Sequence, residues 1–125
     1  MTENEIARVV VDSCYVIHST LGPGLLESVY EKILLYELRE RGCFVEHQAR
    51  LPVIWKNVFI DNGFRADLVV EKKVILELKS VESIAPVHYK QLLTYLRLSD
   101  ARLGLLINFG EQFIKDGIRR VVNNL

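Results

Sequence analysis

The sequence is poor in the residues that cross-link small proteins or hold structural zinc. Its two cysteines, Cys14 and Cys43, belong to no CxxC or Cys/His pair. This pattern argues against a zinc site or a disulfide framework and fits two reduced thiols. The three histidines, His18, His47 and His88, show no ligand spacing. We therefore expect no metal centre built from cysteine or histidine.

Long apolar runs are also lacking. No uninterrupted run approaches the ~20 residues that span a bilayer. The first ten residues, MTENEIARVV, are acidic where a signal peptide would be basic. We therefore expect no membrane segment and a cytoplasmic location.

The chain has no excess of charge of either sign, because 16 Lys and Arg balance 16 Asp and Glu. No overall positive field would attract a long polyanion, so any contact with nucleic acid must be local. Half of the 125 residues are apolar, which supplies a core and excludes disorder. With no repeat or linker-like stretch, the sequence predicts a single domain over residues 1–125.

Changes of hydrophobic period along the chain predict an ααβββαβ order. Apolar residues at helical spacing follow a capping box at Thr2–Glu5 and recur after Gly22-Pro23-Gly24, up to Gly42. A period of two then begins, and Pro86 is suited to the first turn of a later helix. The predicted helices cover 3–19, 25–41 and 86–99. The predicted strands cover 43–55, 58–70 with a bulge at 61–63, 74–80 and 102–108, and Lys56-Asn57 is the predicted turn between the first two strands. The segment 118–122 fits either a last strand or a short helix.

Two of these strands carry charged residues at alternate positions. Glu77 and Lys79 share one face of their strand, and Arg65 and Asp67 share one face of the preceding strand, opposite a continuous apolar face. If the loop between the strands has three residues, 71–73, Asp67 lies opposite Glu77 and Arg65 lies opposite Lys79. A two-residue loop would place the two acids on opposite faces.

Opposed residues on one face of a sheet have Cβ atoms about 4.5–5.5 Å apart, and two carboxylates that close resist ionisation unless a cation lies between them. Oxygen ligands of this kind suit Mg²⁺ or Mn²⁺. Lys79 beside such an ion would stabilise developing charge, or orient or deprotonate an attacking water, which fits phosphodiester hydrolysis. The alternative is a solvated sheet face with weak cross-strand ion pairs.

At these residues the sequence resembles a known family. Asp67 followed by Glu77-Leu78-Lys79 resembles the D…ExK core of the PD-(D/E)XK nuclease superfamily, with Ala66 in place of the usual proline. Gly24 to Tyr30 is similar to the GxxExxY signature of a small bacterial and archaeal family assigned to that superfamily. The resemblance implies a restriction-endonuclease-like αβββαβ core, a mixed sheet flanked by helices, with an extra N-terminal helix.

The resemblance also implies roles for individual residues. Asp67 and Glu77 would be metal ligands and Lys79 the catalytic lysine. Glu27 would join the metal shell, and Gln91 would act near the site from the next helix. Two further residues, Arg65 and Tyr30, are candidates for contact with substrate.

Three of these side chains also have ordinary structural alternatives. Glu27 would be an exposed glutamate in the first turn of a helix, and Gln91 a polar residue closing a helix–sheet interface. Tyr30 would be a buried aromatic with a bonded hydroxyl. Lys72 and Lys73 would join Arg65 in a phosphate-facing rim or in a solvated surface.

The function implied is hydrolysis of phosphodiester bonds, with DNA as the expected substrate and Mg²⁺ or Mn²⁺ as cofactor. The alternative is a nuclease-fold module with little or no catalysis that binds nucleic acid or a protein. A domain of this size has little surface for gripping a duplex, so a homodimer or a helicase or repair protein is an expected partner.

Overall fold

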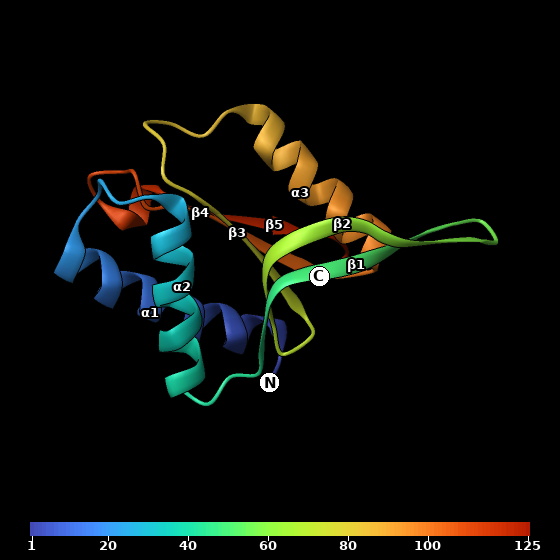
Figure 1. The fold of residues 1–125 in the computed structure, drawn as a ribbon, viewed down its shortest axis with the longest axis horizontal. Coiled ribbons are helices and arrows are strands. Elements are labelled where there is room, and N and C mark those ends of the chain that lie inside the picture. The colour runs from blue at the N-terminus through green and yellow to red at the C-terminus, as the bar shows by residue number, and fades with distance from the viewer.

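A computed structural model describes residues 1–125 apart from the side chain of Asn62, and it shows a mixed sheet with helices on both faces (Figure 1). The elements are α1 (Glu3–Leu21), α2 (Glu27–Glu40), β1 (Val45–Trp55), β2 (Val58–Val70), β3 (Val74–Lys79), α3 (Pro86–Ser99), β4 (Leu103–Asn108), the 3-10 helix η1 (Ile114–Asp116) and β5 (Ile118–Val122). The predicted order and fold class are confirmed, and the undecided segment at 118–122 is a strand. Among the described residues, no helix is both long and apolar enough to cross a membrane.

The ends of the first two helices follow from local sequence. The Thr2 side chain accepts a hydrogen bond from the Glu5 backbone N–H, and the Glu5 carboxylate accepts one from the Thr2 N–H, so the predicted capping box begins α1. Gly22 has φ 69°, a left-handed value suited to the end of a helix. Gly42, just after α2, has φ 87° and plays the same role there.

The sheet has the strand order β1-β2-β3-β4-β5, with β3 and β4 parallel and the other neighbours antiparallel. Val70 pairs with Val74 across the 71–73 loop, as the three-residue loop predicts. Between β1 and β2 the pairs Leu51↔Phe64 and Val53↔Ile60 leave residues 61–63 opposite Pro52, which confirms the predicted bulge.

Two apolar clusters lie on opposite faces of the sheet. The cluster under α1 and α2 includes Leu68 and Val70 of β2, whereas the cluster under α3 includes Phe64 and Ala66 of the same strand. These four residues occupy alternate positions, so a regular strand would place all of them on one face. Because they lie on two faces, the alternation along β2 shifts by one residue at Asp67. The predicted continuous apolar face of this strand is therefore wrong, because the strand changes the side it buries.

The slip extends to β1, where Val45 belongs to the cluster under α1 and α2 and Ala49 to the cluster under α3. Gln48 lies between them with φ 50°, a left-handed value that is uncommon for a residue with a Cβ. The two strands thus shift together, at the level of Gln48 and Asp67, where the candidate site is found.

Candidate active site

Asp67 lies where the ladder between β2 and β3 ends. The last paired residues are Leu68 and Leu76, and beyond them the Asp67 Oδ2 atom accepts a hydrogen bond of 2.8 Å from the Leu78 backbone N–H. Its Oδ1 atom accepts a longer one, 3.3 Å, from the side-chain amide of Gln48. The carboxylate therefore takes the place of a backbone partner and is held in a fixed orientation. Arg65 and Lys79, expected as an opposed pair, lie beyond the paired residues.

Glu77 has an incompletely satisfied carboxyl group. Its Oε1 atom is buried and has no hydrogen-bond partner among the described residues. Burial, followed by the charge of Asp67, raises the pKa of Glu77 to about 9, while Lys79 acts in the opposite direction. Asp67 and Glu77 are thus close enough to interact, and Glu77 holds its proton at neutral pH when no cation is near.

Lys79 and Glu27 lie within electrostatic reach of these acids. The pKa of Glu27, at the first position of α2, is raised by burial and by Asp67 and lowered by Lys79. Lys79 makes no ion pair within 4.0 Å in the described part of the chain. The cross-strand ion pairs of the structural alternative are therefore not formed by Lys79 in this part of the chain.

A cluster behind Asp67 was not foreseen from the sequence. Glu31 of α2 is buried, and its Oε1 atom accepts a 2.5 Å hydrogen bond from the Gln48 amide, which also reaches Asp67. His47 lies 3.3 Å from the other oxygen of Glu31. Burial, then the charge of Asp67, raises the pKa of Glu31, and its bonds to His47 and Gln48 oppose this.

The side-chain amide of Gln48 thus donates hydrogen bonds to two carboxyl groups, those of Glu31 and Asp67. A pocket of about 410 Å³ opens over these groups, between the start of α2 and the two strands. It is lined by Leu26, Glu27, Ser28, Glu31, Gln48 and Asp67.

Gln91 reaches the site only through a neighbour. Its side chain is exposed on α3, and it lowers the pKa of Tyr95, one turn further along. Tyr95 stacks on Phe64 with ring centroids 4.1 Å apart, and its pKa is raised by burial and then by the charge of Glu77. Tyr95 therefore lies within electrostatic reach of Glu77, and its spacing of four residues from Gln91 was the signal that could have identified it.

Tyr30 has a structural role in place of the expected substrate contact. Its side chain is fully buried and stacks on Phe109 with centroids 4.4 Å apart. The hydroxyl donates a 2.5 Å hydrogen bond to the Gly22 carbonyl and accepts one of 3.2 Å from the Leu25 N–H. Tyr30 thereby fixes the loop that leads into α2 and sets the position of Glu27.

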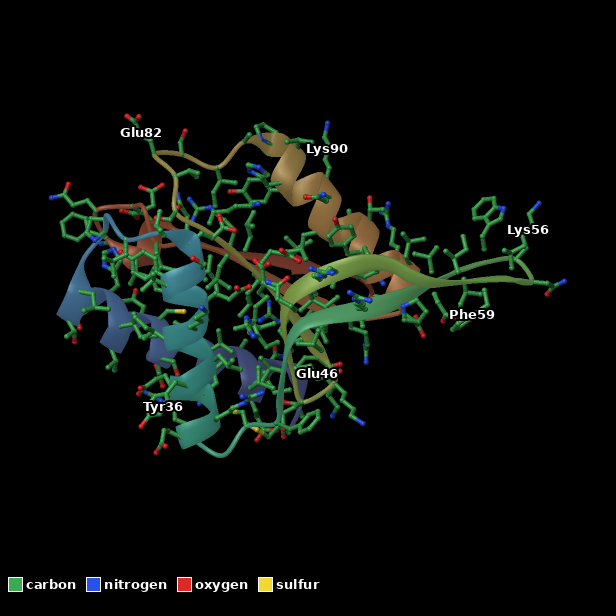
Figure 2. The ribbon with its side chains drawn as sticks, in the orientation of Figure 1. Tyr36, Glu46, Lys56, Phe59, Glu82 and Lys90 are labelled. Carbon is green, nitrogen blue, oxygen red and sulfur yellow. The ribbon has the colours of Figure 1, made fainter. Side chains whose placement is uncertain are left out.

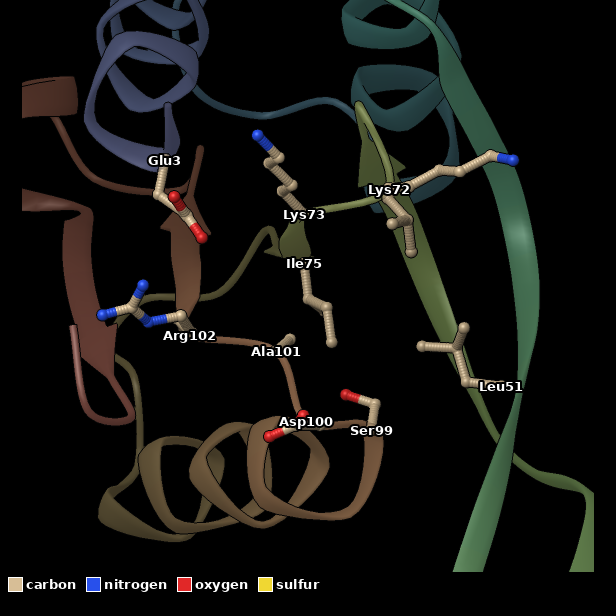
Figure 3. A pocket seen from close by; sticks show the side chains of 10 residues that line it. Glu3, Leu51, Lys72, Lys73, Ile75, Ser99, Asp100, Ala101 and Arg102 are labelled. Carbon is tan, nitrogen blue, oxygen red and sulfur yellow. The ribbon is translucent and has the colours of Figure 1, made fainter. Parts of the chain in front are cut away.

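The predicted basic rim is divided between the two ends of the sheet. Lys72 and Lys73 line a pocket of about 180 Å³ near the start of β3, together with Asp100 and Arg102 (Figure 3). Lys79 is at the other end of that strand. Arg65 is exposed and lies two residues before Asp67. Of the three predicted rim residues, Arg65 is therefore the one near the candidate site, whereas Lys72 and Lys73 are not.

The donor set fits a divalent cation bound by a pair of acids. No group of three or more His, Cys, Asp or Glu side chains is arranged for a metal in the part of the chain that the structure describes. Asp67 and Glu77 nevertheless offer hard oxygen atoms, and the Glu77 Oε1 atom is buried with no partner. A cation there would relieve the repulsion that raises the pKa of Glu77, with water and backbone oxygens as further ligands.

The fold is a mixed sheet between helices, and it brings two acids and a lysine together near the end of β3. A family model described as the PD-(D/E)XK nuclease superfamily matches residues 4–121. The chain therefore belongs to the PD-(D/E)XK nuclease superfamily, whose nucleases generally use divalent metal ions, typically Mg²⁺. Searches of curated proteins and of solved structures found no match.

Proposed function

We propose that this protein is a metal-dependent nuclease that hydrolyses phosphodiester bonds of DNA, and that it belongs to the GxxExxY family within its superfamily. The observation that carries the proposal is the buried Glu77 oxygen without a partner, next to Asp67 and at the D…ExK spacing. A buried carboxyl group with an unused oxygen is costly in a structural network, and a functional site explains why it is present.

Each residue of the site has a distinct task in this proposal. Asp67 and Glu77 hold Mg²⁺ or Mn²⁺, and Glu27 faces the same space from the start of α2. When bound, the ion polarises the phosphate and favours ionisation of water. The Lys79 ammonium group stabilises the negative charge that develops on the phosphate oxygens and orients the attacking water. Gln48 and the Leu78 N–H keep Asp67 in place throughout.

The hydrolysis itself is a simple displacement. A water oxygen forms a bond to phosphorus, the bond from phosphorus to the leaving oxygen breaks, and the proton released from water is balanced by the one gained by the leaving group. The pocket beside Glu27, Gln48 and Asp67 is open to solvent-borne substrate, because Glu27 at its rim is exposed.

The test is cleavage of a panel of single-stranded, duplex, flapped and four-way-junction DNA, with RNA alongside, in Mg²⁺ or Mn²⁺. Glu77→Ala should reduce cleavage on the order of 100-fold or more while the variant stays folded. Glu82→Ala is the matched control, because Glu82 is an exposed glutamate in the loop after β3 (Figure 2). Absence of cleavage by folded, metal-supplied protein would refute the enzyme and favour a module that only binds.

A further inference from the structure

The two strands β1 and β2 form a hairpin arm, defined here as residues 50–65, whose outer part extends beyond both helical layers (Figure 1). Near its tip five large apolar side chains are exposed, and Lys56 and Phe59 lie on the part of the arm that is far from the helices (Figure 2). Trp55 is 63% exposed and Phe59 is 61% exposed. The others are Ile54, Val58 and Ile60. An apolar tip of this size marks a binding surface.

The apolar residues occupy both faces of the arm. Ile54 pairs with Phe59 and Trp55 pairs with Val58, and successive pairs in a ribbon point to opposite sides. A ribbon that is apolar on both sides is suited to insertion into a stack or groove, because a flat partner would cover only one side. The two-stranded ribbon also has the width that the major groove of a duplex admits.

The charges of the arm identify the chemistry of its partner. Arg50 and Arg65 are directly paired across the strands at its base, and both are exposed. Like charges in this position destabilise a hairpin unless an anion lies between or over them. The ion pairs among the described residues are Arg41 with Glu37 and Glu31 with His47, so neither arginine of the arm is neutralised by one.

The tip adds a cation to an aromatic ring. The Lys56 ammonium group lies 5.7 Å from the centre of the Trp55 ring. Base–aromatic stacking and phosphate–cation contacts are the two interactions by which single-stranded nucleic acid is bound without sequence preference. A second copy of the chain is a poorer occupant, since contact between two such arms would bring two arginine pairs together.

We propose that the hairpin arm binds the nucleic-acid substrate, with Trp55 and Phe59 stacking against unpaired or unstacked bases and Arg50 and Arg65 contacting phosphates between the tip and Asp67. This inference rests on the proposed function, because β2 leads from the arm directly to Asp67, two residues after Arg65. The substrate class is therefore nucleic acid with accessible base faces near the cleaved bond.

Trp55 is the only tryptophan in the chain, so its fluorescence reports on the arm alone. The 125-residue protein is titrated with single-stranded, forked and fully paired DNA oligonucleotides in EDTA, which removes the divalent metal that cleavage would need. Binding is followed both by Trp55 emission and by the anisotropy of a label on the DNA. We expect emission to be quenched in step with anisotropy, and most strongly with single-stranded or forked DNA.

Two variants and matched controls separate the arm from general surface effects. Phe59→Ala should weaken binding on the order of 5- to 150-fold, the range for loss of one stacked base. Phe113→Ala is its control, because the Phe113 side chain is similarly exposed, at 57%, and does not belong to the arm. Replacing Arg50 and Arg65 by alanine should lower the salt slope of log Kd by about 1 to 2, and replacing the exposed Arg8 and Arg119 should leave it unchanged.

Several results would overturn the proposal. They are unchanged Trp55 emission when labelled DNA binds, equal affinity of Phe59→Ala and Phe113→Ala, no DNA binding at all, or a dimer in sedimentation that Phe59→Ala converts to monomer. The last would make the arm a self-association surface. If Glu77→Ala abolishes cleavage but the arm variants bind DNA normally, the binding role of the arm is refuted and the proposed hydrolysis is not. If DNA quenches Trp55 through the arm but no cleavage occurs, the proposed hydrolysis is refuted and the binding role of the arm is not.

Discussion

Replacing Glu77 by glutamine tests the electrostatic state of the site directly. Glu77 has a pKa of about 9 against an ordinary value of 4.5, chiefly because it is buried and then because Asp67 is close. The folded protein therefore holds a proton on this side chain at pH 7 that the unfolded chain has released. Glu77→Gln keeps the shape of the protonated acid and has no proton to lose.

The magnitude follows from proton linkage. A group whose folded pKa is raised contributes most below the unfolded pKa, and this contribution declines as pH rises through the folded pKa. Each pH unit in that interval lowers the free energy of unfolding of the wild type by about 1.4 kcal/mol. In EDTA, the stability advantage of Glu77→Gln over the wild type should thus grow by about 3 kcal/mol between pH 5 and pH 7.

The assay is urea unfolding of both proteins at a series of pH values, with Glu82→Gln as the control at an exposed position. Addition of Mg²⁺ at pH 7 should then stabilise the wild type, with release of about one proton per ion bound, and should stabilise Glu77→Gln much less. Parallel stability curves for wild type and Glu77→Gln between pH 5 and pH 7 would refute the reasoning, because they would mean that Glu77 is ionised in the metal-free fold.

Two further substitutions test the supports of the site. Tyr30→Phe removes the hydroxyl that joins Gly22 to Leu25, so it should lower the free energy of unfolding by about 1–3 kcal/mol, while the folded variant should still cleave. Loss of cleavage with unchanged stability would show that the hydroxyl acts on substrate instead. In Gln48→Asn, the asparagine can adopt the left-handed backbone, but its side chain is shorter and its amide lies further from Asp67. The Mg²⁺ affinity measured by calorimetry should therefore fall about 10- to 100-fold. Unchanged affinity would mean that Asp67 needs no support from Gln48.

The parts of the fold that sequence reasoning predicted are those set by local rules. The capping box at Thr2, the turn at Lys56-Asn57 and the three-residue loop at 71–73 depend on neighbours in the chain. The loop length then fixed the register of β2 against β3 and brought Asp67 next to Glu77. Asp67, Glu77 and Lys79 could accordingly be named as a group from spacing alone.

The parts that were missed depend on contacts distant in sequence. No glycine at Gln48 indicates the slip from the sequence. The left-handed backbone of Gln48 is stabilised by the hydrogen bonds that its side-chain amide donates to Glu31 of α2 and Asp67 of β2. Glu31 is buried only because α2 packs across β1, so its sequence context is that of an ordinary surface glutamate. Its position one turn after Glu27 was the available signal.

The two acids at the centre of the site have opposite relations to the rest of the molecule. Asp67 completes the end of a β-ladder through the Leu78 N–H, so its loss would cost stability whether or not the protein cuts anything. Glu77 lowers the stability of the fold when no cation is bound, because its carboxyl group is buried with one oxygen unpartnered and lies close to Asp67. If the proposed cleavage were no longer under selection, substitutions of Glu77 would therefore be expected to accumulate before substitutions of Asp67, because only the loss of Asp67 would weaken the fold.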